Sequence, residues 1–270
     1  MAQQIVLGQY VPGSSPLHKL DPRTKLIAAI VLMVLILSSF SLTSLAVIGI
    51  FVLVLIWLSK LKFKLIIRTV RPVLILLAFA FLFNLFSGSG EIIFSYSFIT
   101  IRLDGVINAF IITFRLIMLV LATSILITLT TTPTLIADAI ERLLSPLKIL
   151  RFPVHEIAMM MSIALRFVPT LLDEMQKIMK AQSSRGADYD TGSPIRRARG
   201  FVSILVPLFV SAFRRADDLA TAMESRCYRG GKGRTRLKTM KFSYLDVIFS
   251  LFVVLISVAV YVLPLVFPTV

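Results

Sequence analysis

Long apolar runs constrain what this chain can fold into more than any other feature of its sequence. Five such runs cover residues 25–40, 44–59, 72–86, 105–131 and 243–266. A helix of roughly 20 apolar residues crosses the hydrocarbon layer of a membrane, and each run is close to that length. Since 57% of the 270 residues are hydrophobic and the mean hydropathy is +0.90, a soluble globular domain is excluded. We therefore predict an all-α integral membrane protein with about five transmembrane helices.

Basic residues predict the orientation of these helices. Cations crowd the connection between the second and third runs, at Lys60, Lys62, Lys64, Arg68 and Arg71. Short basic loops face the cytoplasm, so we expect the N-terminus inside the cell and the C-terminus outside. Residues 1–22 lack the apolar core of a cleavable signal peptide, and the first helix should remain as an anchor. Asp21 and Pro22 predict its start, because Asp caps free N–H groups and Pro suits the first helical position.

Three features inside or between the runs carry more specific expectations. Arg115 lies well within the fourth run, where an arginine either contacts polar groups of the helix bundle or faces a partner; we favour the bundle. Residues 92–101 are β-branched and aromatic, which indicates a small external hairpin. Asp246, near the inner end of the last run, is expected to pair with the basic loop 229–236 that precedes it.

Residues 133–242 differ from the rest of the chain because they are amphipathic and charged. Apolar residues at helical spacing predict cytoplasmic helices there, the first of them kinked or shortened by Pro146. The three helices are expected over 134–149, 154–184 and 194–226. The chain then divides into an N-terminal membrane domain of four spans (1–132), a cytoplasmic helical domain (133–242) and a C-terminal transmembrane helix (243–270).

The apolar faces of the three amphipathic helices need burial. The underside of the transmembrane bundle, the helices themselves or another protein can provide it. Met159, Met160 and Met161 form a soft apolar patch near the start of the second helix. Methionine-rich surfaces adapt to several partners, but methionine also fills cores, so both interpretations stay open.

One pattern, Ala-x-x-Ser-Arg followed by Gly or Cys, occurs twice. It ends the second amphipathic helix at Ala181–Gly186 and the third at Ala222–Cys227, and each helix carries a Val-Pro step upstream. We interpret the copies as two equivalent arms that each present an arginine, whose planar fork of donors matches a carboxylate. The alternative is that each arginine only complements the helix dipole before a C-cap. Two arms favour two similar partner subunits, one for each arm.

The two copies differ at their last residue, which is Gly186 in one and Cys227 in the other. Glycine tolerates the left-handed backbone of a helix C-cap, whereas the Cβ of cysteine opposes it. We therefore expect the second helix end to be shaped differently from the first, and the two partner sites to be non-identical.

The sequence offers no catalytic chemistry. Neither histidine is accompanied by a serine or an acid at motif spacing, and Asp246 is the only acidic residue in the five runs. This argues against an intramembrane hydrolase and a proton-coupled transporter. Loop 229–236 lacks the G-x-x-x-x-G-K-[ST] order, so we reject nucleotide binding there. We expect no catalytic residue, cofactor or metal site, and the single cysteine permits no intrachain disulfide.

The net charge of +15 indicates an anionic lipid surface or an acidic partner. In a soluble protein it would suggest nucleic acid, but here the cytoplasmic cations of a membrane protein explain part of it. We therefore expect no nucleic-acid partner.

The chain resembles EcfT, the transmembrane coupling protein of energy-coupling factor (ECF) transporters. The resemblance rests on the paired motifs Ser184-Arg185-Gly186 and Ser225-Arg226-Cys227, where the family has an Ala-Arg-Gly type of sequence. Two further stretches support it, Leu17–Lys25 (LHKLDPRTK) and Ile127–Pro133 (ITLTTTP) running into Leu143–Lys148 (LLSPLK). The resemblance extends over nearly the whole chain.

The resemblance implies a non-catalytic subunit in the plasma membrane of a prokaryote. Two ABC ATPases, which bind the ATP, would dock on the six motif residues. A separate membrane protein, the S-component, would capture a vitamin or a metal ion and bind this scaffold. We place the S-component on the apolar faces around Met159, Met160, Met161, Leu205, Leu208 and Phe209.

A different class of protein is the alternative: a stand-alone membrane protein whose basic cytoplasmic domain binds anionic lipid or a regulator. It predicts that charge reversals weaken binding at all basic residues rather than at two. A third interpretation, a membrane enzyme, predicts activity in the isolated chain. Neither explains why there should be two matched arginine arms.

Overall fold

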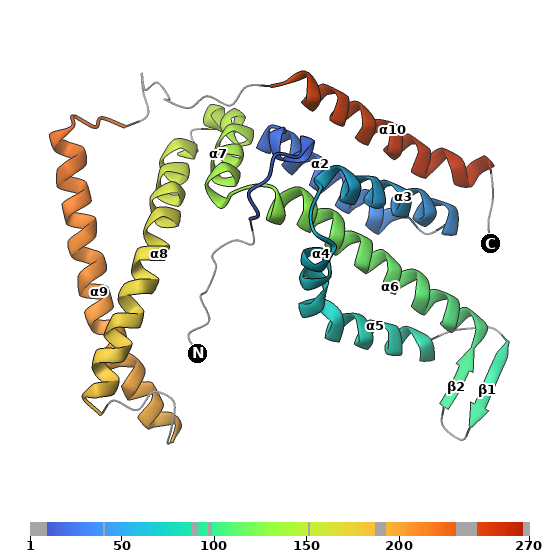
Figure 1. Cartoon of the computed structure of the whole chain (residues 1–270), viewed down its shortest axis with the longest axis horizontal. Coiled ribbons are helices and arrows are strands. Elements are labelled where there is room, and N and C mark those ends of the chain that lie inside the picture. Colours follow the sequence, from blue (N-terminus) through green and yellow to red (C-terminus); the bar gives the residue numbers. More distant parts are fainter. Residues whose placement is uncertain are drawn as a thin grey trace. The chain divides into compact units, whose positions relative to one another are not determined.

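The computed structural model describes residues 10–39, 41–87, 91–96, 99–150, 152–186, 193–230 and 242–266 (Figure 1). Contacts divide the chain into two compact units. The first combines residues 1–139 with 239–270, and the second is 140–238. Helices dominate both units, as the apolar and amphipathic patterns predict.

The first unit contains the most apolar helices. Its elements are α1 (Pro16–Lys19), α2 (Pro22–Ser38), α3 (Leu42–Ser59), α4 (Phe63–Val70), the short η1 (Arg71–Val73), α5 (Leu74–Phe86), β1 (Ile92–Tyr96), β2 (Ile99–Arg102), α6 (Leu103–Thr123), the π-helical η2 (Ser124–Leu129) and α10 (Tyr244–Val266). Helix α7 (Pro133–Leu143) leads from this unit into the second. The second unit continues with η3 (Ser145–Leu150), α8 (Val154–Ser184) and α9 (Pro194–Ser225).

Within the described ranges, five helical segments are long and apolar enough to cross a membrane. They are Leu42–Ser59, Phe63–Phe86, Leu103–Leu129, Val154–Ser184 and Tyr244–Val266. Four of them contain runs predicted to span. The fifth predicted span corresponds to α2, which has 17 residues. Helix α8 is the least apolar of the five segments. The chain is thus a multi-pass helical membrane protein.

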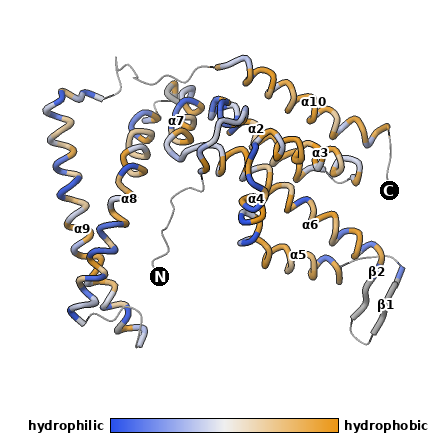
Figure 2. Tube along the Cα trace, viewed as in Figure 1, coloured by the Kyte–Doolittle hydropathy of each residue, from blue (hydrophilic) through white to orange (hydrophobic). Residues whose placement is uncertain are grey.

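The core of the first unit lies between α2, α3, α6 and α10. Its fully buried side chains include Leu32, Ile36, Phe51, Leu55 and Ile125. Large apolar side chains also cover the outer faces of helices in this unit, for example Ile75 and Phe79 of α5 and Leu251 of α10. Figure 2 shows α3, α5, α6 and α10 as mainly hydrophobic along their lengths. A surface of this kind suits lipid rather than water.

The basic segment after α3 is a helix, and the prediction of a loop there was wrong. Lys60 ends α3 in the left-handed conformation (φ 51°), and α4 begins at Phe63. Lys64 and Arg68 lie one helical turn apart and are exposed, whereas Ile66 is buried. This alternation of cations and apolar residues gives an amphipathic helix. Pro72 lies within the short η1 turn that connects α4 to α5.

The hairpin and the first helix start are confirmed, whereas the external location of the hairpin stays a prediction. Strands β1 and β2 pair antiparallel, with Tyr96 opposite Ile99. At the start of α2, the Asp21 carboxylate accepts a hydrogen bond from the Arg23 backbone N–H at 2.9 Å, and Pro22 occupies the first turn. These local signals predicted structure well because they act through neighbouring residues only.

Arg115 contacts the helix bundle, as favoured from the sequence. Its guanidinium donates to the backbone carbonyl of Ser39, the residue that ends α2. Carbonyl groups at a helix C-terminus have no partner within the helix and carry partial negative charge. Arg115 of α6 therefore caps α2, which accounts for a cation at this depth.

A buried polar cluster joins the start of α2 to the end of α6 and the start of α10. The Lys25 ammonium donates to the Thr130 carbonyl at 3.0 Å and to the Thr130 and Thr131 hydroxyls at 3.3 and 3.2 Å. The Asp246 carboxylate accepts the backbone N–H groups of Asp21 and Ser243, both at 2.7 Å. Asp246 thus contacts these backbone groups, and most of its predicted partner loop, from residue 231 onward, lies outside the described residues.

The stretch Leu17–Lys25, on which part of the family resemblance rests, is structural. Leu17 is buried, and the His18 ring donates through Nε2 to the Val11 carbonyl at 2.9 Å. Ser15 Oγ lies 2.6 Å from the other ring nitrogen, Nδ1. Together with Asp21 and Lys25, these residues hold the N-terminal segment against the first unit.

The second unit is built on two long helices that run antiparallel. Helices α8 and α9 cross where Ser211 and Arg215 of α9 both donate to the Glu174 carboxylate, the arginine at 2.8 Å (Figure 1). Glu174 and Arg215 thus use their charges in a contact between the two helices. At the start of α8, His155 Nδ1 lies 3.2 Å from the Glu141 carboxylate of α7. Helix α7 ends before Pro146, as predicted.

Candidate partner-docking site

The first arm is the C-terminal end of α8. Arg185 is its C-cap, with φ −91° and ψ 6°, and Gly186 follows in the left-handed region at φ +82°. The Gly186 N–H donates to the Ser183 carbonyl at 2.9 Å, and the Arg185 N–H donates to the Gln182 carbonyl at 3.0 Å. Arg185 and Gly186 are both exposed.

The second arm, at the end of α9, also has a left-handed residue directly after its arginine. Cys227 takes φ +58° immediately after Arg226, as Gly186 does after Arg185. The Cys227 N–H donates to the Glu224 carbonyl at 2.8 Å, and the Tyr228 N–H donates to the Met223 carbonyl at 3.0 Å. These two bonds define a Schellman motif, a standard helix C-cap.

The expectation that Cys227 would reshape the second helix end was therefore wrong. A non-glycine residue in the left-handed region costs roughly 1 kcal/mol. The two backbone hydrogen bonds of the cap offset that cost, since they satisfy carbonyls that would otherwise lack a partner. Tyr228 and Met223 also line one pocket. The cap, rather than the side chain at its left-handed position, decides the shape of the arm.

The serines of the two motifs turn back onto their own helices. The Ser184 hydroxyl donates to the Lys180 carbonyl, and the Ser225 hydroxyl donates to the Ala222 carbonyl, each at 3.1 Å. The arginines beside them are exposed and, within the described part of the chain, neither enters a salt bridge. Each arm thus presents an exposed arginine.

The antiparallel pairing places the two arginines at opposite ends of the helix pair. Arg226 lies beside the beginning of α8, where Met159 lines the same pocket. Arg185 follows Met159 by 26 residues along α8, a distance of about 40 Å in a helix. One small acidic groove cannot hold both arginines.

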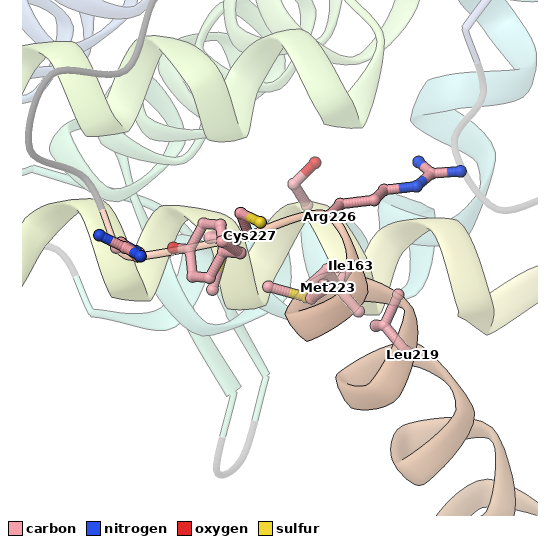
Figure 3. Close-up of a pocket in the computed structure, with 10 residues that line it drawn as sticks. Ile163, Leu219, Met223, Arg226 and Cys227 are labelled. Atoms are coloured by element: carbon pink, nitrogen blue, oxygen red, sulfur yellow. The ribbon is translucent and has the colours of Figure 1, made fainter.

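A pocket of about 540 Å³ lies beside the second arm, between the first turns of α8 and the last turns of α9. Its lining residues are Met159, Ser162, Ile163, Leu219, Met223, Arg226, Cys227, Tyr228, Arg229 and Gly230. Figure 3 shows Ile163, Leu219 and Met223 together below Cys227, while the Arg226 side chain extends away from Cys227. The lining is apolar at its base, carries two arginines and includes no acidic residue.

The residues predicted as an S-component platform occupy two separate patches. Met160 and Met161 are exposed on the first turns of α8. Leu205 and Phe209 are exposed on α9, and Leu208 is half-buried between them. The α8–α9 crossing at Glu174 separates the two patches along the helix pair. The role of these residues stays a prediction.

Sequence reasoning missed the pocket and its link between Met159 and Arg226. Each helix does carry a signal, because Met159 and Ile163 on α8, like Leu219 and Met223 on α9, are four residues apart and share a face. Which end of α8 meets which end of α9 follows only from their antiparallel packing. In the described part of the chain, no group of three or more His, Cys, Asp or Glu side chains is placed to hold a metal ion.

The class of protein is now defined: a multi-pass helical membrane protein with two equivalent arginine-tipped helix ends. The chain belongs to the CbiQ family, described as cobalt transport protein, whose model matches residues 13–237. It is 49% identical to the energy-coupling factor transporter transmembrane protein EcfT of Ruminiclostridium cellulolyticum over 92% of each chain. The EcfT proteins of Thermosediminibacter oceani and Bacillus subtilis are 47% and 42% identical, over 90% and 91% of this chain and 92% and 93% of their own.

Proposed function

We propose that this chain is the energy-transducing membrane subunit of an ECF-type ABC importer. In this role it couples ATP hydrolysis by two ATPase subunits to the uptake of a vitamin or metal ion that a separate S-component binds. The observation that carries the proposal is that α8 and α9 both end in an exposed arginine followed by a left-handed residue. Membership of a family whose relatives are named EcfT supports it.

The geometry of the arms favours one ATPase for each arm. An exposed guanidinium at a helix end can enter an acidic groove and bind a carboxylate through two parallel hydrogen bonds. Because the arginines lie at opposite ends of the helix pair, relative movement of the two ATPases would turn α8 against α9. The arms would pass that movement on, while ATP stays in the partner subunits and this chain has no catalytic role.

The exposed apolar patches of α8 and α9 suit the S-component. Met160, Met161, Leu205 and Phe209 expose side chains that water solvates poorly. Leu208 extends the patch on α9, while Met159, the third methionine predicted for this site, lines the pocket beside Arg226. A membrane protein that rests on both patches would sense a change in the α8–α9 angle.

We place the protein in the plasma membrane of a prokaryote, with its N-terminus in the cytoplasm and its C-terminus outside. The exposed cations of α4, Lys64 and Arg68, and the charged α8–α9 unit then face the cytoplasm together. The apolar outer faces of α3, α5 and α10 contact the lipid bilayer.

Purification of the tagged chain from its native membrane in mild detergent tests the proposal. The wild type should recover two ATPase subunits and one small membrane protein. Arg185→Ala and Arg226→Ala should each release one ATPase, with affinity lower by about 30-fold or more, since each leaves an acidic partner unpaired. Arg214→Ala is the matched control, because Arg214 is an exposed arginine of α9 away from both arms. Two bound ATPases and full uptake in the double-arm variant would refute the proposal.

A further inference from the structure

The pocket beside the second arm makes the two arms unequal. Both arms carry a left-handed residue after the arginine, but their surroundings differ. Among the described residues, no heavy atom beyond the chain neighbours of Gly186 lies within 4 Å of the position that a Cβ would take on it in the first arm. Cys227, at the same position of the second arm, lines the pocket between α8 and α9. The first arm therefore offers an exposed tip, and the second offers a tip together with a cavity.

The composition of the pocket indicates the chemistry of its occupant. Met159, Ile163, Leu219 and Met223 form an apolar surface, and all four are partly exposed. Arg226 and Arg229 are exposed and also line the pocket, which has no acidic residue in its lining. An apolar group with a carboxylate beside it complements this arrangement in both hydrophobicity and charge.

The two methionines favour a protein side chain as the occupant. Methionine is unbranched and polarizable, so it adapts its shape to a partner's side chain. The pocket is also continuous with Arg226, the residue that the proposed function assigns to ATPase docking. A segment that reaches Arg226 would cover the pocket as well.

We infer that the pocket receives an apolar side chain of the ATPase subunit bound to the second arm, while a neighbouring carboxylate of that subunit binds Arg226 or Arg229. This inference rests on the proposed function and deepens it. The second arm then holds its ATPase by an apolar anchor and by charge, whereas the first arm relies on its exposed tip. The two docking sites are thereby distinguishable.

The first test fills or charges the pocket without touching the arginines. Ile163→Trp fills the cavity, and Met223→Glu places a carboxylate against the one that the partner brings. Each variant should weaken binding of the second ATPase by about tenfold or more, so that the purified complex retains one ATPase for each chain. The matched controls are Ala164→Trp and Ala220→Glu, at exposed neighbours that do not line the pocket. They should retain two.

The arm variants separate failure of this inference from failure of the proposed function. If Arg226→Ala releases one ATPase but both pocket variants keep two, the pocket has no docking role and the inference falls alone. If Arg226→Ala also keeps two, the proposed function fails first.

A second test needs no substitution, because Cys227 is the only cysteine of the chain, is exposed and lines the pocket. In the complete complex, a polar maleimide should label Cys227 at least about tenfold more slowly than in the chain stripped of its ATPases. Equal labelling rates in a complex that still holds two ATPases would mean that the pocket is open, which overturns the inference.

Discussion

At the scale of single residues, backbone conformation at two positions defines the arms. Gly186 and Cys227 both take positive φ, although only glycine does so without steric cost. The hydrogen bonds of each cap hold the residue there, and the preceding arginine is left exposed. A cysteine in this position is tolerated because the cap supplies the required bonds.

Substitutions at these two positions should act in opposite directions. Gly186→Ala should lower the free energy of unfolding by roughly 1 kcal/mol, because alanine opposes φ +82° and no neighbouring atom adds a clash. Cys227→Gly should raise it or leave it unchanged, since the Cβ cost disappears while the unfolded chain gains freedom. Thermal unfolding in detergent measures both. A lower melting temperature for Cys227→Gly would show that the cysteine side chain, rather than the cap, stabilises the arm.

At the scale of elements, buried polar contacts hold the first unit together where apolar packing alone would leave helices free to slide. Lys25 of α2 binds the end of α6, Asp246 of α10 binds the start of α2, and Arg115 of α6 caps the end of α2. Each contact joins a charge to a backbone group at a helix end, where N–H or C=O groups need partners. Helix α2 is thus attached at both ends.

Removing the Lys25 ammonium should loosen this attachment. Lys25→Met keeps the length of the side chain but leaves the Thr130 carbonyl and two hydroxyls without their donor. We expect the free energy of unfolding to fall by about 1–3 kcal/mol. Lys19→Met serves as the control, because Lys19 is exposed. Equal thermal stability of the two variants would mean that the ammonium contributes nothing net at this site.

At the scale of the whole molecule, the antiparallel α8–α9 pair carries the proposed functions on different parts of one surface. Arg226 and the patch of Met160 and Met161 lie together at one end of the pair. Arg185 lies at the other end, and the patch of Leu205 and Phe209 on α9 lies on its side of the Glu174 crossing. A change in the crossing would affect all of them.

Charging the two apolar patches should release the S-component and spare the ATPases. Met160→Asp and Leu208→Asp each place a carboxylate in a surface that is expected to become buried, and an unpaired buried charge is costly. Detergent pull-downs should lose the small membrane protein and keep both ATPases. Thr170→Asp, at an exposed position of α8, should retain every partner. Unchanged capture in both patch variants would remove these residues from the S-component site.

The sequence by itself determined the class of fold, most helix boundaries and the two arms. The signals that predicted these features are local, because each acts through residues close together in the chain. They are the apolar runs, the Asp21-Pro22 helix start, the β-branched residues of the hairpin and the repeated Ser-Arg pattern. The basic helix α4 was missed because a run of basic residues is typical of a loop. Its apolar residues, which alternate with the cations at helical spacing, were not considered.

Tertiary structure alone decided which distant groups meet. Three pairs of residues that are far apart in sequence show this: Lys25 with Thr130, Glu174 with Arg215, and Met159 with Arg226. No rule of sequence spacing relates the two members of a pair. Their contacts depend on the direction and rotation of packed helices, which arise from many small apolar contacts summed over the unit. The same packing placed the two arginines at opposite ends of one helix pair and a pocket beside the second arm, which the two matching motifs did not reveal.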